Sequence, residues 1–530
     1  MSTRDDHGEG AALDRPPRTL AELLAALPEG LAAGARTHAL RDEPGRVVLG
    51  PLRDDSRAVA AGDAFVAVPG ATHDGHAFLA QVAAAGAGLG IVEAGRFAEA
   101  ARREPTLAAL PRLELDDVAA ALPELAATWH GRPGEHMRLA GVTGTNGKTT
   151  VAHLLAAILR AAGRPHLRLG TTGNWLVDHE DRAGFTTPFP VELQALLARA
   201  RAAGASEGVM EVSSHALAQG RVRPLRYRAV GLTSFSQDHL DYHPSMAAYL
   251  AAKCLLASEH ADPQGVAVAP SSQGEATRAF LAAAAEAGVA RRWTCAREDD
   301  GASELRVLAR REPGPKAGLA ARVLTPAGEL ELRSPLVGAF NLDNLLVSLG
   351  LALGLDIELE LAGAALAEAT GAPGRLERVL AGDGRPGPAV YVDYAHTPDA
   401  VARSLEALRP VTRGALIVVL GCGGDRDPSK RPLMGRSASE GADRFIATSD
   451  NPRSEDPEAI VDQMVAGADP SGATLVRELD RAAAIALAIA EAGPDDVVLI
   501  AGKGHEDYQI LGDTKIHFDD REHAKAALLG

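Results

Sequence analysis

Short hydrophobic runs alternate with helical segments along most of the chain. In the first part, β-like runs begin at Arg46 (RVVL) and Ala64 (AFVAVP), and GIVE follows an alanine-rich stretch at Gly90. Runs of this length predict strands, and their alternation with helical segments predicts a small α/β domain. The polar stretch RLELDD, which ends at Asp117, precedes another Ala/Leu-rich helical segment. We place the first domain boundary in this stretch, after residue 115.

Two further blocks follow. The second opens with the apolar run MRLAGVT (137–143), enters a helix at Thr149 and includes a buried-strand pattern, VMEVS (209–213). The third begins after the turn-forming segment GAPGR (371–375). It contains four strongly apolar runs, at 389–394, 415–420, 444–448 and 496–501. Such runs between helical segments predict mostly parallel, helix-covered sheets. We therefore expect an α/β protein with three domains, 1–115, 116–370 and 371–530.

Composition narrows the functional classes. A chain of 530 residues with a formal net charge of -16 does not suit a general nucleic-acid or anionic-membrane surface, although local basic pockets for phosphates are compatible with it. The three cysteines, Cys254, Cys295 and Cys422, have neither disulfide-framework nor metal-ligand spacing, so we expect a cytoplasmic protein. Residues 1–18 have no apolar core and are expected to form a disordered leader, and no apolar run reaches the roughly 18 residues of a membrane span.

The segment GVTGTNGKTT (141–150) carries the clearest local chemistry. An apolar strand precedes it and a helix follows, so Gly144 and Gly147 let the backbone approach a polyphosphate at a helix N-terminus. Lys148 then faces the β- and γ-phosphates, and the Thr149 hydroxyl is a ligand for Mg²⁺. The alternative is a glycine-rich turn that precedes Lys-Thr by chance.

This loop is one of many ordered motifs that resemble those of the Mur ligase family. These ATP-dependent enzymes join amino acids to UDP-linked muramoyl peptides. The resemblance covers almost the whole chain and is carried by the phosphate loop and by DDSR (54–57), TTP (186–188), EVSSH (211–215), DHLDYH (238–243), AKCLL (252–256), GAFNLDN (338–344), PGRLE (373–377), DYAHTP (393–398), GCGGDRD (421–427), DNPR (450–453) and GKGHE (502–506).

The resemblance implies a fold and a reaction. The fold has a UDP-binding domain, a central P-loop ATPase-type domain and a C-terminal Rossmann-like domain with a mostly parallel sheet that binds the amino acid. The series is most similar to ligases that add meso-diaminopimelate to UDP-N-acetylmuramoyl-L-alanyl-D-glutamate through an acyl phosphate. ATP and Mg²⁺ are then required, the partners are small molecules, and a monomer without nucleic-acid or membrane partners is expected.

Glu211, His239 and Lys253 are the catalytic candidates beside Lys148. A carboxylate at the end of a buried strand suits Mg²⁺, and the alternative for Glu211 is a structural ion pair. From residues alone, Lys253 is typical of a solvated helix face. The resemblance instead implies that Lys253 is carbamylated and that His239 is a second metal ligand, although imidazole is not a usual magnesium ligand. ThrSerPheSer (233–236) departs from the Thr-Asn-Leu-Ser common in the family.

The resemblance also assigns substrate contacts. Hydroxyl, amide and guanidinium groups can bind an anionic nucleotide-sugar. Taken singly, each of these residues would be interpreted as an ordinary polar residue on the surface. The ATP set is Gly144, Thr145, Asn146, Gly147, Lys148, Thr149, Thr150, Asn344, Arg375 and Asp393. The nucleotide-sugar set is Ser56, Ala71, Thr72, His73, Thr186, Thr187, Ser213, Gln219 and Arg221.

The third block supplies the diaminopimelate set, Arg426, Asp450, Asn451, Pro452, Arg453, Gly502 and Glu506. Arg453 can hold the distal carboxylate bidentately, and Glu506 can accept from the distal ammonium. The alternative for Arg453 is a surface salt bridge with Glu455 or Asp456. Three other functions stay open: the same reaction with L-lysine, a folylpolyglutamate synthase-like ligase, and a non-catalytic nucleotide-binding switch.

Overall fold

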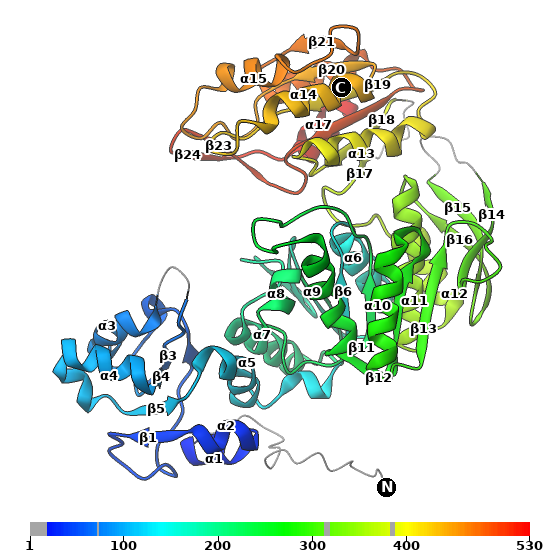
Figure 1. Ribbon diagram of the computed structural model, residues 1–530. Coiled ribbons are helices and arrows are strands. Elements are labelled where there is room, and N and C mark those ends of the chain that lie inside the picture. Colours follow the sequence, from blue (N-terminus) through cyan, green and yellow to red (C-terminus); the bar gives the residue numbers. More distant parts are fainter. Residues whose placement is uncertain (1–18, 71–73, 312–317, 382–386) are drawn as a thin grey trace.

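The computed structural model describes residues 19–70, 74–311, 318–381 and 387–530. Its strands form sheets of five, eleven and six strands and a two-stranded ribbon. Figure 1 shows the three large sheets in three bodies that follow one another along the chain, which we call the N-terminal, central and C-terminal parts. The predicted three-body α/β architecture is confirmed.

The N-terminal part has the strand order β1-β5-β4-β3-β2, in which only β1 runs antiparallel to its neighbour. Alternate side chains point to opposite faces, so Phe65 packs on the α3/α4 side and Val66 on the α1/α5 side. The predicted strand at Arg46 is wrong, because Val48 is 77% exposed and forms only an isolated bridge with Thr19. The elements are α1 (Leu20–Ala26), α2 (Glu29–Gly34), β1 (Arg36–His38), β2 (Leu52–Arg53), β3 (Ala64–Val66), α3 (Leu79–Ala84), β4 (Leu89–Glu93), α4 (Ala94–Arg103), β5 (Arg112–Leu115) and α5 (Val118–Trp129).

The central part has the order β16-β15-β14-β13-β12-β11-β6-β10-β7-β8-β9, with a parallel core from β14 to β7. Val209 packs with α6, α11 and α12 on one face, and Met210 packs with α7, α9 and α10 on the other. The strands are β6 (Arg138–Thr143), β7 (His166–Gly170), β8 (Gly173–Leu176), β9 (His179–Asp181), β10 (Glu207–Glu211), β11 (Tyr227–Leu232), β12 (Ala261–Pro270), β13 (Arg291–Ala296), β14 (Leu305–Arg311), β15 (Leu319–Thr325) and β16 (Gly328–Ser334). The helices are α6 (Lys148–Ala161), α7 (Pro190–Ala202), α8 (Ser214–Ala218), α9 (Met246–Ser258), α10 (Glu275–Glu286), α11 (Ala339–Gly354) and α12 (Leu359–Glu368).

The C-terminal part has the order β17-β18-β22-β19-β20-β21, parallel except at β17. Helices cover both faces, because Val418 packs with α13–α15 and Val419 with α16 and α17. The elements are β17 (Glu377–Val379), β18 (Ala389–Asp393), α13 (Pro398–Leu408), β19 (Leu416–Leu420), α14 (Lys430–Gly441), β20 (Arg444–Ala447), α15 (Pro457–Val465), β21 (Thr474–Arg477), α16 (Arg481–Glu491), β22 (Val497–Ala501), β23 (Tyr508–Leu511), β24 (Thr514–His517) and α17 (Asp520–Leu529). All four predicted apolar runs are strands.

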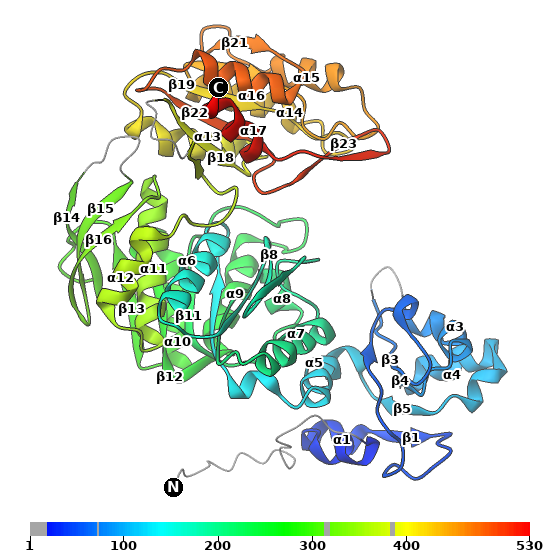
Figure 2. The same ribbon diagram turned by 180° about the vertical axis from the view of Figure 1, so that it is seen from behind.

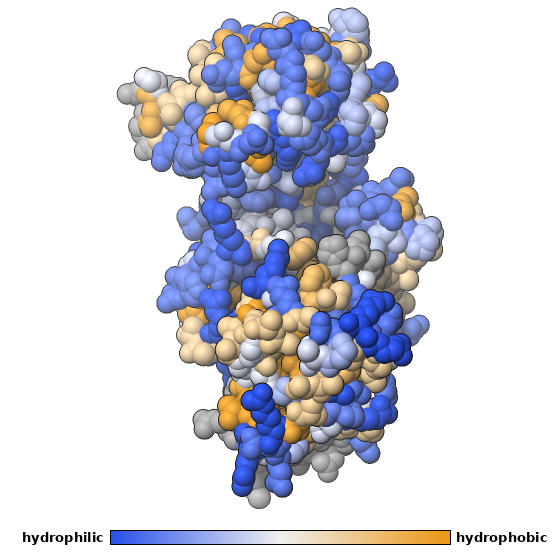
Figure 3. Space-filling view, turned by 90° about the vertical axis from the view of Figure 1, so that its left-hand side faces the viewer, coloured by the Kyte–Doolittle hydropathy of each residue, from blue (hydrophilic) through white to orange (hydrophobic). Residues whose placement is uncertain are grey.

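Figures 1 and 2 show the three parts as separate bodies. Figure 2 shows the reverse view, in which α5 leads from the N-terminal part to the central part. On the face seen in Figure 3 the surface narrows below the C-terminal part, and strongly hydrophobic residues are scattered among hydrophilic ones. Among the described residues, no helix combines the length and apolar character needed to span a bilayer.

Candidate active site

The glycine-rich loop joins the end of β6 to the start of α6. Gly144 has φ +150 and Gly147 has φ +91, conformations that favour glycine. A Cβ at Gly144 would lie 2.0 Å from Thr233 Oγ1, and one at Gly147 would lie 2.5 Å from Asn344 Oδ1. Both glycines are therefore required by close packing as well as by backbone conformation. α6 begins at Lys148, one residue before the predicted Thr149.

Lys148 folds back over this loop. Its Nζ donates to the backbone oxygens of Gly144 at 2.8 Å and Thr145 at 3.0 Å. Burial lowers the pKa of Lys148, the charge of Arg375 lowers it further, and Glu211 opposes the shift. Among the described residues, no carboxylate forms an ion pair with Lys148. Its ammonium is thus held by carbonyls at the loop where a polyphosphate would lie.

Glu211 ends β10 and is 1% exposed. Its Oε2 accepts from Thr149 Oγ1 at 2.9 Å, and its Oε1 accepts from the backbone N of Thr171 at 2.9 Å. A Cβ at Gly170 would lie 2.2 Å from Glu211 Oε1, so the glycine makes room for the carboxylate. These partners are neutral, and within the described ranges the structural ion pair considered for Glu211 is not found.

Lys253 lies on α9 and is 1% exposed, so the interpretation as a solvated helix face is wrong. Its Nζ is 4.3 Å from the centre of the Tyr249 ring. Burial holds the pKa of Lys253 well below its usual value, and Lys148 lowers it further against the opposing charge of Asp238. The pattern of helix positions could not reveal this, because Lys148 and Asp238, whose charges act on Lys253, lie on other elements.

Aromatic rings surround His239 in that loop. His239 has φ +53, and its ring centre lies 4.8 Å from that of His215 and 5.9 Å from that of Tyr249, both edge to face. Asp238 Oδ2 is 3.5 Å from His239 Nε2. Burial lowers the pKa of His239 while Asp238 opposes the shift, so the neutral imidazole is favoured. His243 hydrogen-bonds to a buried serine hydroxyl.

The departure from the family pattern at Ser234 and Phe235 preserves contact with the glycine-rich loop. Ser234 Oγ accepts from the backbone N of Asn146 at 2.9 Å and donates to the Asn146 oxygen at 3.0 Å. The Phe235 ring lies 5.3 Å from that of Tyr249. Tyr249 in turn hydrogen-bonds to Thr145 at 3.1 Å. Serine and phenylalanine therefore tie this segment to the loop and to the helix that carries Lys253.

Five predicted nucleotide-sugar residues lie together beside Glu211. Thr187 Oγ1 donates to the Glu211 backbone oxygen at 2.8 Å and accepts from the Ser213 backbone N at 3.0 Å. Arg221 donates to the Thr187 backbone oxygen at 3.3 Å and to Gln219 Oε1 at 2.7 Å. Thr186 is the fifth member, and its Oγ1 lies 3.0 Å from that of a threonine that also hydrogen-bonds to Glu211.

The other predicted members of that set are in the N-terminal part. Ser56 begins a short 3-10 helix capped by Asp55, and Asp55 also pairs with Arg57. The structure brings Ser56 into no described contact with the Glu211 group. Ala71, Thr72 and His73, like the expected leader 1–18, lie outside the described residues.

The predicted adenine-side residues occupy two parts of the fold. Asn344 is buried on α11 behind Gly147 and donates to Asn341 Oδ1 at 3.0 Å. Arg375 stacks on Tyr394, with its Cζ 4.7 Å from the ring centre. Asp393, at the end of β18, accepts from the backbone N of Leu376 at 2.7 Å and from two further donors, while burial raises the pKa of its carboxyl.

The Asp-Asn-Pro-Arg segment (450–453) follows β20 and forms hydrogen bonds with the loop that follows β22. Asn451 Nδ2 donates to Glu506 Oε2 at 3.0 Å. A Cβ at Gly502, which has φ +117, would lie 2.8 Å from Asp450 Oδ2. Lys503 is fully buried, with its Nζ 3.3 Å from Asn451 Oδ1 and 3.4 Å from Glu506 Oε2.

Arg453 has a different partner from the one expected of a surface arginine. Its Nη1 donates to the Gly424 backbone oxygen at 2.6 Å, and Glu455 pairs instead with Arg431 at 2.8 Å. Among the described residues Arg453 forms no salt bridge with Glu455 or Asp456, so that alternative is wrong. Pro452 lies between Asn451 and Arg453 in the turn, whereas Arg426 is exposed on the neighbouring loop.

The chain is similar to known proteins along most of its length. Models of the Mur ligase family match the chain in three segments: "Mur ligase family, catalytic domain" at 52–130, "Mur ligase middle domain" at 142–352 and "Mur ligase, glutamate ligase domain" at 374–504. A relative from Gloeobacter violaceus, named UDP-N-acetylmuramoyl-L-alanyl-D-glutamate--2,6-diaminopimelate ligase, is 45% identical over 97% of this chain and 98% of its own. The chain belongs to the Mur ligase family.

Solved structures place this Mur ligase among similar folds. A structure titled as a UDP-N-acetylmuramoyl-L-alanyl-D-glutamate--2,6-diaminopimelate ligase has a TM-score of 0.68 and 31% identity, and it covers 92% of this chain and 96% of its own. A folylpolyglutamate synthase from Mycobacterium tuberculosis has a TM-score of 0.54 and 20% identity, covering 78% and 94%. The second likeness shows a shared fold only.

The Mur ligase site also contains residues that the sequence did not single out. Thr171 bonds both Glu211 oxygens, Lys503 contacts two members of the diaminopimelate set, and Tyr249 lies between Lys253 and His239. Lys503 lies within the GKGHE motif, which could have indicated it. Thr171 and Tyr249 carry no such local pattern, because their roles depend on strands and helices that are distant in sequence.

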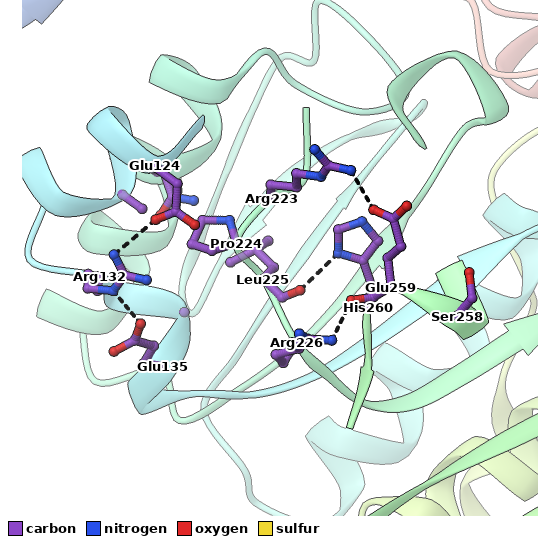
Figure 4. Close-up of a pocket in the computed structure, with 13 residues that line it drawn as sticks. Glu124, Arg132, Glu135, Arg223, Pro224, Leu225, Arg226, Ser258, Glu259 and His260 are labelled. Carbon is purple, nitrogen blue, oxygen red and sulfur yellow. Dashed lines mark hydrogen bonds and ion pairs between the residues drawn. The ribbon is translucent and has the colours of Figure 1, made fainter. Parts of the chain in front are cut away.

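A cavity of about 610 Å³ lies at the opposite edge of the central sheet of this Mur ligase. It is lined by residues that precede β6, β11 and β12, whereas the glycine-rich loop follows β6. Figure 4 shows Arg132 with Glu124 and Glu135, and Arg223 with Glu259, paired along its wall. These charges pair with one another, whereas Lys148 and Glu211 lie at the carboxyl edge of the sheet.

Proposed function

We propose that the protein is an ATP-dependent amide ligase that adds meso-diaminopimelate to UDP-N-acetylmuramoyl-L-alanyl-D-glutamate in peptidoglycan precursor synthesis. The observation that carries this proposal is the meeting of Lys148, Glu211 and buried Lys253 around one glycine-rich loop. A strongly similar relative bears the name of that ligase. Glycines, a loop lysine and a buried carboxylate together suit phosphoryl transfer from ATP.

The proposed reaction has two steps, and the residues of the glycine-rich loop bind the phosphates in the first. The terminal carboxylate of the nucleotide-linked dipeptide attacks the γ-phosphorus of ATP, so an acyl phosphate forms and ADP leaves. The amine of diaminopimelate then attacks the acyl carbon, and phosphate leaves as the amide forms. Gly144, Gly147 and Lys148 orient the phosphates and offset their charge, with Thr145, Asn146 and Thr150 completing the loop. A protein nucleophile is not needed.

The donor set fits Mg²⁺. Glu211 is a buried carboxylate whose described partners are neutral hydrogen-bond donors, so a cation would supply the missing positive charge. Glu211 and the Thr149 hydroxyl would hold one ion, and His239 with modified Lys253 would hold a second. Bound Mg²⁺ supplies charge neutralisation for the transferring phosphate.

Carbamylation is the modification we propose for Lys253. Its low pKa favours the neutral amine, the form whose nitrogen attacks carbon dioxide. The new N–C bond leaves an N-carboxylate and releases one proton to solvent. This exchanges an ammonium, which would repel Mg²⁺, for an anion that offers two oxygens.

Substrate positions follow from the groups described above. We propose that Ser56 with Ala71–His73 binds uridine diphosphate, and that the Glu211 neighbours bind the muramoyl peptide. Arg453 would hold the distal carboxylate of diaminopimelate and Glu506 its ammonium, with Arg426, Asp450, Asn451, Pro452 and Gly502 completing that site. Asn344, Arg375 and Asp393 would lie on the adenine and ribose side of ATP.

The predicted boundaries at 115/116 and 370/371 assign one substrate to each domain. Three separate sheets support this division. We further propose a cytoplasmic monomer, because the reaction consumes ATP and each substrate is a small molecule.

Phosphate release tests the proposal. Purified protein is supplied with ATP, Mg²⁺ and UDP-N-acetylmuramoyl-L-alanyl-D-glutamate, and a panel of amino acids is then added one at a time. Phosphate release should require diaminopimelate and should yield the UDP-linked tripeptide by mass spectrometry. Turnover with L-lysine or a folate substrate would replace the proposed substrate, and nucleotide turnover without any acceptor would support the switch instead.

A further inference from the structure

Two aromatic rings are exposed on the loop that precedes α7. Phe185 is 53% exposed and Phe189 is 37% exposed, and their ring centres lie 5.0 Å apart in an edge-to-face arrangement. They flank Thr186 and Thr187, two of the proposed muramoyl-peptide contacts. Exposing large apolar side chains to water costs free energy, so the position of these two rings beside the proposed muramoyl-peptide contacts calls for an explanation.

Phe189 supports the guanidinium of Arg221. Arg221 Cζ lies 3.8 Å from the Phe189 ring centre, while the group donates to Gln219 Oε1 at 2.7 Å and to the Thr187 backbone oxygen at 3.3 Å. One face and two edges of the guanidinium are thereby fixed. Its Nη2 forms no hydrogen bond with any described residue, so these N–H groups are available to an anion.

A third exposed aromatic residue, Tyr242, contacts Gln219. The Gln219 Nε2 donates to the Tyr242 hydroxyl at 3.2 Å, and Tyr242 is 43% exposed. The Tyr242 ring centre lies 4.2 Å from that of His215, which in turn contacts His239. Gln219 is thus oriented with its oxygen toward Arg221 and its amide nitrogen toward Tyr242.

We propose that Phe189 and Tyr242 are positioning residues that hold Arg221 and Gln219 for the anionic peptide end of the nucleotide-linked substrate. We name the four residues the aromatic clamp. The inference rests on the proposed function of this site. Thr187 contacts both Arg221 and the Glu211 backbone, which ties the clamp to the phosphate-transfer region. Ser56 lies in the short 3-10 helix that follows β2 in the N-terminal part, outside the clamp, and we assign the uridine end to it.

The Phe189 ring is not needed to form α7. Phe189 is the N-cap residue, but its side chain makes no capping hydrogen bond, and its backbone oxygen accepts from Leu193 N at 2.8 Å. A leucine can keep that backbone bond while removing the π face. Phe189→Leu should therefore fold, and Phe189→Tyr should retain the stacking.

The test compares Phe189→Leu, Phe189→Tyr, Arg221→Ala and the double variant Phe189→Leu/Arg221→Ala. Loss of a cation–π contact should raise the KM for the nucleotide-sugar by about 5- to 30-fold in Phe189→Leu, with the KM for ATP unchanged. Phe189→Tyr should behave as wild type. The double variant should match Arg221→Ala within about twofold, since Phe189 acts through Arg221.

Calorimetry separates this inference from the function on which it rests. Phe189→Leu should weaken binding of UDP-N-acetylmuramoyl-L-alanyl-D-glutamate but leave the affinity for UDP alone unchanged, and Tyr242→Phe should weaken the former by about 2- to 10-fold. Equal weakening of UDP, or additive effects in the double variant, would overturn the clamp. If the wild-type protein turns over substrate and Phe189→Leu has the same KM for the nucleotide-sugar, the clamp alone is overturned. If the wild-type protein does not bind the substrate at all, both proposals are overturned.

Discussion

Lys253 offers the sharpest test of the proposed chemistry, because two substitutions separate charge from volume. Lys253→Met keeps an unbranched stem in a site that is 1% exposed, whereas Lys253→Ala opens a cavity beside Tyr249. Both remove the nitrogen that would carry the carbamate. Removing a charge-stabilising group typically slows such reactions by about 10²- to 10³-fold, so we expect at least a 100-fold loss of kcat in either variant.

The cavity makes the two variants respond differently to added carboxylates. A short carboxylate such as acetate should partly restore the activity of Lys253→Ala, because it can enter the space and replace the missing anion. Lys253→Met should not respond, since its side chain fills that space. The assay is phosphate release with both substrates present, and melting temperatures show that both variants are folded. Full activity in Lys253→Met would refute the carbamate and leave Lys253 a packing residue.

Four further predictions follow from particular contacts. Arg453→Ala should raise the KM for diaminopimelate by tens-fold or more in steady-state kinetics, about 2–5 kcal/mol for an unpaired carboxylate, with the KM for ATP unchanged; a shift in both would contradict the assignment. Gly144→Ala should abolish ATP binding by calorimetry, because its Cβ would lie 2.0 Å from Thr233 Oγ1. In CO₂-free buffer, the depressed pKa of Lys253 means that the unfolded chain binds more protons, so the free energy of unfolding should rise with pH between the lowered value and the ordinary 10.5, and Lys253→Met should flatten that rise in urea titrations. ATP with nucleotide-sugar should compact the protein in small-angle scattering, and an unchanged radius of gyration would argue against domain closure.

Local sequence determined much of the architecture. Apolar runs such as 415–420 and 496–501 became buried parallel strands because side chains on both faces meet helices. The failed run at Arg46 shows the limit, since a hydrophobic segment forms a strand only where a neighbour pairs with it. The glycine-rich loop could be recognised from sequence because its glycines, strand and helix are contiguous.

Only the tertiary structure decided how individual side chains behave. The sequence of its own helix predicts a surface position for Lys253, yet the side chain is 1% exposed, and burial together with the charge of Lys148 lowers its pKa. Arg453 donates a hydrogen bond to a backbone oxygen of another loop. The Phe189 ring contacts the guanidinium of Arg221, which is 32 positions further along the sequence. Sequence motifs show which chemical groups are present. The burial and the hydrogen-bond partners of those groups come from elements that are distant in sequence and that the folded sheets bring together.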